Sequence, residues 1–152
     1  LPRPDVEKEN SLFTPMVVFS CLLALILVLS FIPKKKVQRF LVVFDFLFFF
    51  FLGLAGILLL FMWFGTNHLV CQDNFNLVWA LPTHAIAAFF LWRKAQWVQY
   101  YLLATIIFQS LLLLGWIFLP QQLNISLIPI VLLILLRSWL LIQKPFVQTQ
   151  TI

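Results

Sequence analysis

The sequence contains few charged residues, few glycines and few cysteines. Charged side chains make up 10% of the 152 residues, whereas soluble domains carry about 25%. An intrinsically disordered chain needs many charges and few apolar residues, so that class is excluded. Four glycines exclude a collagen-like repeat, and two cysteines exclude a disulfide scaffold. Because Cys21 and Cys71 form no CxxC pair, we expect neither to be catalytic or to bind zinc, and we expect no cofactor.

Apolar residues are abundant instead. They make up 63% of the chain, and 18 of them are phenylalanine. A chain of this length cannot bury so much apolar surface, because a small domain leaves a large share of its surface in water. A soluble monomer is therefore excluded, and the composition indicates a protein of the lipid bilayer.

The basic residues give the chain a formal net charge of +5. They occur in short clusters between apolar runs, which is the pattern that sets membrane topology. A face that binds nucleic acid would require a continuous basic surface, so we expect no nucleic-acid partner.

Five apolar runs divide residues 12–144. Each run approaches the ~20 residues that an α-helix needs to cross about 30 Å of hydrocarbon. Only helices or closed barrels span a bilayer, and the alternating pattern of barrel strands is absent. We therefore predict an all-α fold, a membrane bundle of five transmembrane helices. The runs cover residues 14–32, 40–64, 77–92, 100–119 and 127–143.

The loops between these runs predict the orientation of the bundle. One side carries Lys34, Lys35, Lys36, Arg39, Arg93, Lys94 and Lys144. The other side carries only Arg3 and Lys8, both before the first run. The positive-inside rule places the N-terminus in the periplasm and the tail, residues 145–152, in the cytoplasm. We expect residues 1–11 to be a periplasmic linker from an upstream domain that this chain lacks.

The richest polar stretch precedes the third run, on the predicted outer face. It contains His68, Asn74 and Asn76, and it leads into Trp79 and Pro82. A proline break frees backbone carbonyls, and broken helices at a membrane face often line sites. In that interpretation His68 moves a proton or orients a nucleophile. In the alternative, Asn74 and Asn76 cap the third helix and His68 is a solvated loop residue.

Three ionisable residues lie inside the runs. We expect His84 to hydrogen-bond a neighbouring helix, with Gln109 and Ser110 as candidate partners. Asp45 and Arg137 lie at matched depths, roughly 8–9 Å from the inner membrane boundary. Opposite charges at equal depth predict a structural charge pair. The alternative is a protonated Asp45 and an Arg137 that reaches toward lipid phosphates.

Three stretches carry a family resemblance: GLAG at 53–56, FGTNH at 64–68 and NFNLVWALPT at 74–83. They resemble the C-terminal membrane region of a Bacteroidota family in which a periplasmic papain-like Cys–His domain precedes several membrane helices. Members of that family are implicated as lipoprotein N-acyltransferases, which acylate the N-terminal cysteine of a diacylated lipoprotein. The resemblance covers about residues 12–120 and is sharpest at 66–82.

The resemblance implies a multi-pass protein of the bacterial inner membrane, with the catalytic cysteine and histidine in the upstream domain. No catalytic residue and no metal site are then expected in this chain, and the full-length protein is expected to be an acyltransferase. The implied partners are the upstream domain, a phospholipid and a diacylated lipoprotein. The matching positions, which would bind substrate or dock that domain, are His68, Asn74, Asn76, Trp79 and Pro82.

Two other functions stay open at this point. The helices are a non-catalytic anchor for a periplasmic domain in one alternative, and a small transporter component in the other. A transporter predicts an inverted repeat and a polar lining, and neither is visible in the sequence.

Overall fold

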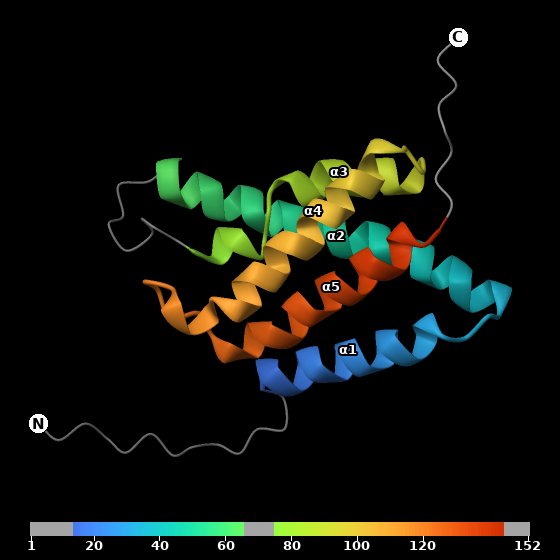
Figure 1. Ribbon diagram of the computed structural model, residues 1–152, viewed down its shortest axis with the longest axis horizontal. Helices are drawn as coiled ribbons and strands as arrows, with labels where there is room; N and C mark the ends of the chain where they lie inside the picture. Colours follow the sequence, from blue (N-terminus) through green and yellow to red (C-terminus); the bar gives the residue numbers. More distant parts are fainter. Residues whose placement is uncertain (1–13, 66–74, 145–152) are drawn as a thin grey trace, which may run out of the picture.

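Within the described residues, the chain forms five α-helices (Figure 1). The computed structural model describes residues 14–65 and 75–144. The helices are α1 (Pro15–Ser30), α2 (Lys35–Gly65), α3 (Thr83–Trp92), α4 (Trp97–Leu114) and α5 (Ile128–Ile142). Three short 3-10 helices lie between them, namely η2 (Phe75–Val78), η3 (Trp116–Phe118) and η4 (Ile125–Leu127). The prediction of an all-α fold with five helices is confirmed.

Four described segments are long and apolar enough to cross a membrane. They are Lys35–Gly65, Phe75–Trp92, Trp97–Leu114 and Ile125–Ile142. Helix α1 is shorter, with 16 residues and a length of about 24 Å. Thr14 caps it, since the Thr14 hydroxyl accepts the Val17 N–H at 3.4 Å. Large apolar side chains on the outer faces of all five helices are exposed, as lipid contact requires.

The third predicted helix differs most from the structure. The sequence predicts a helical run over residues 77–92 that Pro82 interrupts, and in the structure η2 ends at Val78 and α3 begins only at Thr83. Pro82 has no N–H to donate to a preceding turn, and it disfavours helical backbone at the residue before it. The proline therefore divides the run into two parts and does not merely kink it.

The other four helices also differ from the predicted bounds, α1 and α5 by at most two residues at either end and α2 and α4 by more. Helix α2 begins at Lys35 and not at residue 40, because its basic first turns continue the helix beyond the apolar run. Helix α4 ends at Leu114 and not at residue 119, and Gly115 occupies its C-cap. The apolar residues after Gly115 form η3 instead.

Two glycines bring α2 close to the broken third segment. A Cβ at Gly53 would overlap the Ala85 backbone, and a Cβ at Gly56 would overlap the carbonyl oxygen of Ala80. The spacing of three residues places both glycines on one face of α2. This face therefore packs directly against the backbone of α3 and of the break.

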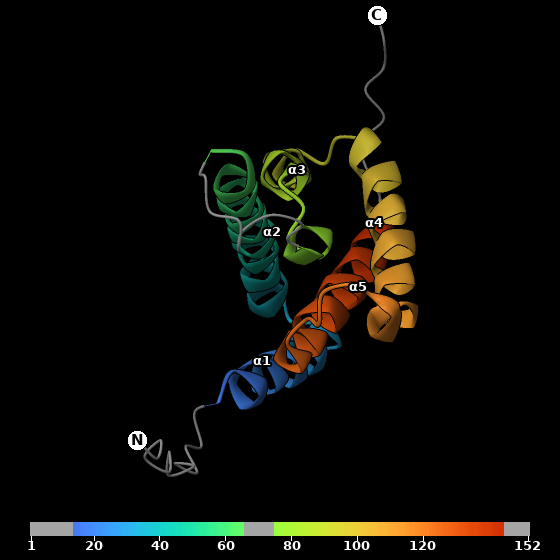
Figure 2. The ribbon, with the colours of Figure 1, turned by 90° about the vertical axis from the view of Figure 1, so that its left-hand side faces the viewer.

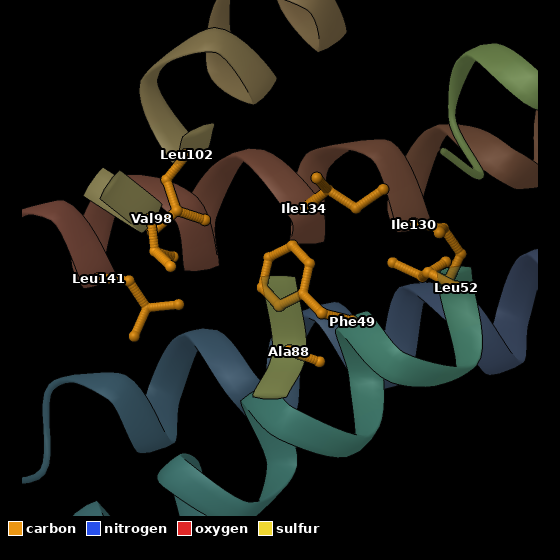
Figure 3. Close-up of a cluster of buried hydrophobic side chains, with 8 residues drawn as sticks. All are labelled: Phe49, Leu52, Ala88, Val98, Leu102, Ile130, Ile134 and Leu141. Atoms are coloured by element: carbon orange, nitrogen blue, oxygen red, sulfur yellow. The ribbon is translucent and has the colours of Figure 1, made fainter. Parts of the chain in front are cut away.

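The main core joins four helices (Figure 3). Phe49 of α2 is fully buried at its centre, and its ring lies among apolar side chains from α3, α4 and α5. Helix α1 packs against α5, on the side of the bundle away from α4 (Figure 2). The other buried members of the cluster are Leu52, Ala88, Val98, Leu102, Ile130, Ile134 and Leu141.

The basic residues between and after the helices gather at one end of the bundle. The turn from α1 to α2, the turn from α3 to α4 and the end of α5 all lie at the right-hand end of Figure 1. The start of α1, the end of α2 and the start of α5 lie at the opposite end. The bundle thus has a basic end, and the assignment of that end to the cytoplasm stays a prediction.

Candidate functional site

The break before α3 is held by Asn76. Its side-chain oxygen accepts a hydrogen bond from the Trp79 indole N–H at 2.9 Å, and its carbonyl oxygen accepts the Ala80 N–H at 3.1 Å. Asn76 therefore fixes the Trp79 side chain and turns the backbone. It does not cap α3, because that helix begins seven residues later at Thr83.

Two glutamines bind backbone groups of η2 and of the break. Gln109 of α4 is fully buried, and its amide N–H₂ donates to the carbonyl oxygens of Val78 at 3.1 Å and Trp79 at 3.5 Å. The side-chain oxygen of Gln121 accepts the Phe75 N–H at 2.7 Å. A carbonyl without a partner is costly inside a membrane, so these contacts stabilise η2 and the break.

His84 lies in the first turn of α3 and is fully buried. Its Nδ1 is hydrogen-bonded to the Tyr101 hydroxyl of α4 at 2.6 Å, and that hydroxyl also bonds Thr83 Oγ1 at 2.9 Å. The Phe49 ring meets the imidazole edge-to-face at 5.3 Å. The predicted bond to a neighbouring helix is confirmed, but the partner is Tyr101. Gln109 was the wrong candidate because it faces the break.

Asp45 and Arg137 form a bidentate ion pair that joins α2 to α5. Arg137 Nε lies 2.6 Å from Asp45 Oδ1, and Nη2 lies 2.7 Å from Oδ2. The third donor, Nη1, reaches Ser30 Oγ of α1 at 2.7 Å. Arg137 is 1% exposed and Asp45 is 2% exposed. Both charges are thus paired inside the protein, and the guanidinium does not extend toward lipid.

Ser30 completes this network and was not predicted from the sequence. Its hydroxyl donates to the Ile26 carbonyl at 2.6 Å and accepts from Arg137. As the last residue of α1 it lies beside the basic turn, where a polar residue carries no distinctive signal in the sequence. The network joins three helices through one guanidinium.

An apolar groove of about 390 Å³ lies between α1, α2, α5 and the break. Trp79 forms its wall at the break, and Ala55 leaves space on the α2 side. The remaining lining residues are Phe19, Phe44, Leu47, Phe48, Phe51, Leu52, Leu127 and Ile130. A groove of this size and lining accepts a long apolar ligand.

The structure brings together three of the five predicted site residues. Trp79 lines the groove, Asn76 holds the Trp79 indole, and Pro82 ends the break against Gly56 of α2. His68 and Asn74 lie outside the described residues, so the polar site that they were predicted to form with Asn76 stays a prediction. Gln109, Gln121 and the groove were missed, because their roles depend on how the helices are rotated against one another.

A family model provides the link to known proteins. The model, described as the Lnb transmembrane domain, matches residues 7–145. No curated protein matches the chain significantly, and no solved structure does so either. The matched region contains all five helices and the four long apolar spans of a multi-pass membrane protein. The chain therefore belongs to the family of Lnb transmembrane domains.

Proposed function

We propose that this chain is the membrane module of a lipoprotein N-acyltransferase of the bacterial inner membrane, and that the groove beside Trp79 holds an acyl chain of its lipid substrates. The groove is the observation that carries this proposal, since its lining is entirely apolar. Membership of the Lnb transmembrane domain family supports the same function. The substrates are a phospholipid donor and a diacylated lipoprotein acceptor.

The position of the groove fits this role. The groove runs along α2 from Phe44 in its first half to Ala55 in its second half. At the Ala55 end, its walls come from the first half of α1, which contains Phe19, and from Leu127, which directly precedes α5. These segments lie toward the end of the bundle opposite the basic end (Figure 1). By the positive-inside rule that end faces the periplasm. An acyl chain in the groove would then place its ester group beneath a periplasmic catalytic domain.

The resemblance to the acyltransferase family implies two chemical steps, both in the periplasmic domain. A cysteine thiolate attacks an ester carbonyl of the phospholipid, which forms a thioester and releases a lysophospholipid. The free amino group of the lipoprotein's N-terminal cysteine then attacks the thioester, which forms an amide and returns the thiol. The membrane module contributes by holding the acyl chain in position, since orientation alone can supply several kcal/mol of the barrier.

Filling the groove tests the proposal. Ala55→Phe places a ring in the groove, whereas the matched Ala104→Phe adds the same ring to an exposed face of α4. In the full-length protein supplied with a labelled phospholipid, we expect Ala55→Phe to lower lipoprotein N-acylation tenfold or more, about 1.4 kcal/mol in the barrier. Ala104→Phe should leave the rate unchanged.

Thermal unfolding separates a filled groove from a damaged fold. If Ala55→Phe destabilises the protein, the smaller Ala55→Leu provides a milder filling of the same space. Normal acylation by a stably folded Ala55→Phe protein would refute the groove as the acyl site. It would favour the alternative in which the helices only anchor a periplasmic domain.

A further inference from the structure

A second cavity lies at the basic end of the bundle, away from the groove beside Trp79. It has a volume of about 80 Å³ and lies between α2, the end of α3 and the end of α5. A single water molecule needs roughly 10–15 Å³ by this measure, so the cavity admits several waters or one phosphate group. Its lining residues are Val42, Asp45, Phe46, Leu91, Trp92, Lys94, Leu141 and Lys144.

The charges that line this cavity are unbalanced. Both oxygens of the Asp45 carboxylate are bonded to Arg137, so this pair is neutral as a unit. Within the described part of the chain, neither the Lys94 nor the Lys144 ammonium forms an ion pair. Burial lowers the pKa of Lys144. The negative charge of Asp45 raises this pKa, and the positive charges of Arg137 and Lys94 lower it further, each by less than burial does. An anion between the two lysines would compensate this excess of positive charge.

Lys94 has an unusual backbone conformation for a lysine. Its φ is +52°, and it is the only described residue other than glycine with a positive φ. It occupies the left-handed position of a Schellman motif, because the N–H groups of Lys94 and Ala95 donate to the carbonyls of Leu91 and Phe90. Glycine or asparagine is favoured at that position. A lysine thus lines the cavity at a position where its backbone conformation is unfavourable.

A groove of about 460 Å³, apolar except for Arg93, adjoins the cavity on the surface of α2 and α3. The two spaces share Phe46 and Trp92 as lining residues. The groove continues along the exposed Val43, Leu47 and Phe89. A charged cavity beside an apolar groove matches a phospholipid, which has a phosphate next to its acyl chains.

We propose that the cavity and this groove bind one anionic phospholipid, with its phosphate between Lys94 and Lys144 and an acyl chain along Phe46 and Trp92. Basic pockets between membrane helices bind anionic headgroups in this way, and charged donors make the strongest hydrogen bonds to phosphate oxygens. The lipid would come from the leaflet at the basic end. It is distinct from the proposed acyl substrate, although Leu47 of α2 lines both grooves.

Lipid binding to the purified chain in detergent, followed by native mass spectrometry, tests this proposal. The probes are phosphatidylglycerol, which is anionic, and phosphatidylcholine with the same acyl chains, which carries no net charge. We expect one phosphatidylglycerol molecule to bind at least tenfold more tightly than phosphatidylcholine. Replacing both lysines, by Lys94→Asn and Lys144→Gln, should weaken that binding about 25-fold, since each nearby lysine contributes about fivefold.

A charge-matched control separates the site from general attraction to the basic end. Lys34→Gln with Lys36→Gln removes the same charge from two exposed residues outside the cavity, one directly before α2 and one in its first turn. We expect this control to change phosphatidylglycerol binding by less than twofold. An equal loss in both double variants, or equal binding of the two lipids by the wild type, would overturn the proposal.

The variants also test whether the fold is intact. Asparagine adopts left-handed backbone more readily than lysine, so the thermal unfolding temperature of Lys94→Asn without lipid should equal or exceed that of the wild type. Added phosphatidylglycerol should stabilise the wild type but not the Lys94→Asn/Lys144→Gln variant. A variant that is stabilised as strongly as the wild type would overturn the proposal. Acyl transfer by the Ala55→Phe protein is a separate measurement, so either proposal can fail alone.

Discussion

Removing one partner of the Asp45–Arg137 pair should destabilise the fold strongly. Asp45→Ala breaks two of the three hydrogen bonds of the guanidinium and leaves only the bond to Ser30. Arg137 is 1% exposed, so its charge would stay buried without a counter-charge. A buried charge left in this way typically costs about 3–5 kcal/mol of stability. We expect Asp45→Ala and Arg137→Met each to lower the free energy of unfolding by that amount.

The double variant should be much less destabilised than the sum of the two single variants. With both charges gone, the site has no uncompensated ion, and replacement of a buried pair by apolar residues is often close to neutral. A double-mutant cycle should therefore give a coupling free energy of at least about 2 kcal/mol. Unfolding of the chain in mixed micelles, followed by helical circular dichroism as the denaturing detergent increases, measures all four proteins.

Arg137→Lys and Ser30→Ala measure the separate contributions of the hydrogen bonds in this network. Lysine keeps the charge but lacks the planar guanidinium that bonds both carboxylate oxygens and Ser30. The stability of Arg137→Lys should therefore lie between that of the wild type and that of Arg137→Met. Ser30→Ala removes one hydrogen bond to a charged group, which is worth about 1.5–3 kcal/mol. Additive single effects in the cycle would refute the reasoning, because the two charges would then not act as a unit.

Three further predictions concern the break and its surroundings. Gly56→Ala should cost about 1–3 kcal/mol in thermal unfolding, since its Cβ meets rigid backbone, whereas at Gly65 the Cβ meets a movable phenylalanine ring and the cost should be small. Asn76→Ala leaves the Trp79 indole N–H without the acceptor that holds it. It should cost about 1 kcal/mol and lower N-acylation by the full-length protein. Asn74→Ala should leave unfolding nearly unchanged but lower N-acylation tenfold or more if Asn74 belongs to the predicted polar site.

The sequence predicted those features that depend on one helix at a time. The lengths of the hydrophobic runs predicted five helices. The matched membrane depths of Asp45 and Arg137 predicted that these residues pair, although they are 92 positions apart in the sequence. The break at Pro82 followed from the chemistry of proline alone. Each of these inferences needed only the rise of a helix or the absence of an N–H.

Apart from the Asp45–Arg137 pair, contacts between helices could not be predicted in the same way. The choice of Tyr101 over Gln109 as the partner of His84 depends on the rotation of α4 about its axis, and both residues lie in one apolar run. Low charge on every face leaves no amphipathic pattern that would fix that rotation. The grooves were missed for the same reason, since their walls come from separate helices.

The broken third segment has an energetic consequence that favours a role for it. A continuous helix from Phe75 to Trp92 would satisfy its own carbonyls inside the bilayer. The break instead requires Gln109, a fully buried polar side chain, to bond the carbonyls of Val78 and Trp79. In return, it turns the Trp79 side chain onto the wall of the apolar groove. A helix that served only as an anchor would not require this arrangement. The arrangement therefore supports the proposal that the segment positions an acyl chain under a catalytic domain.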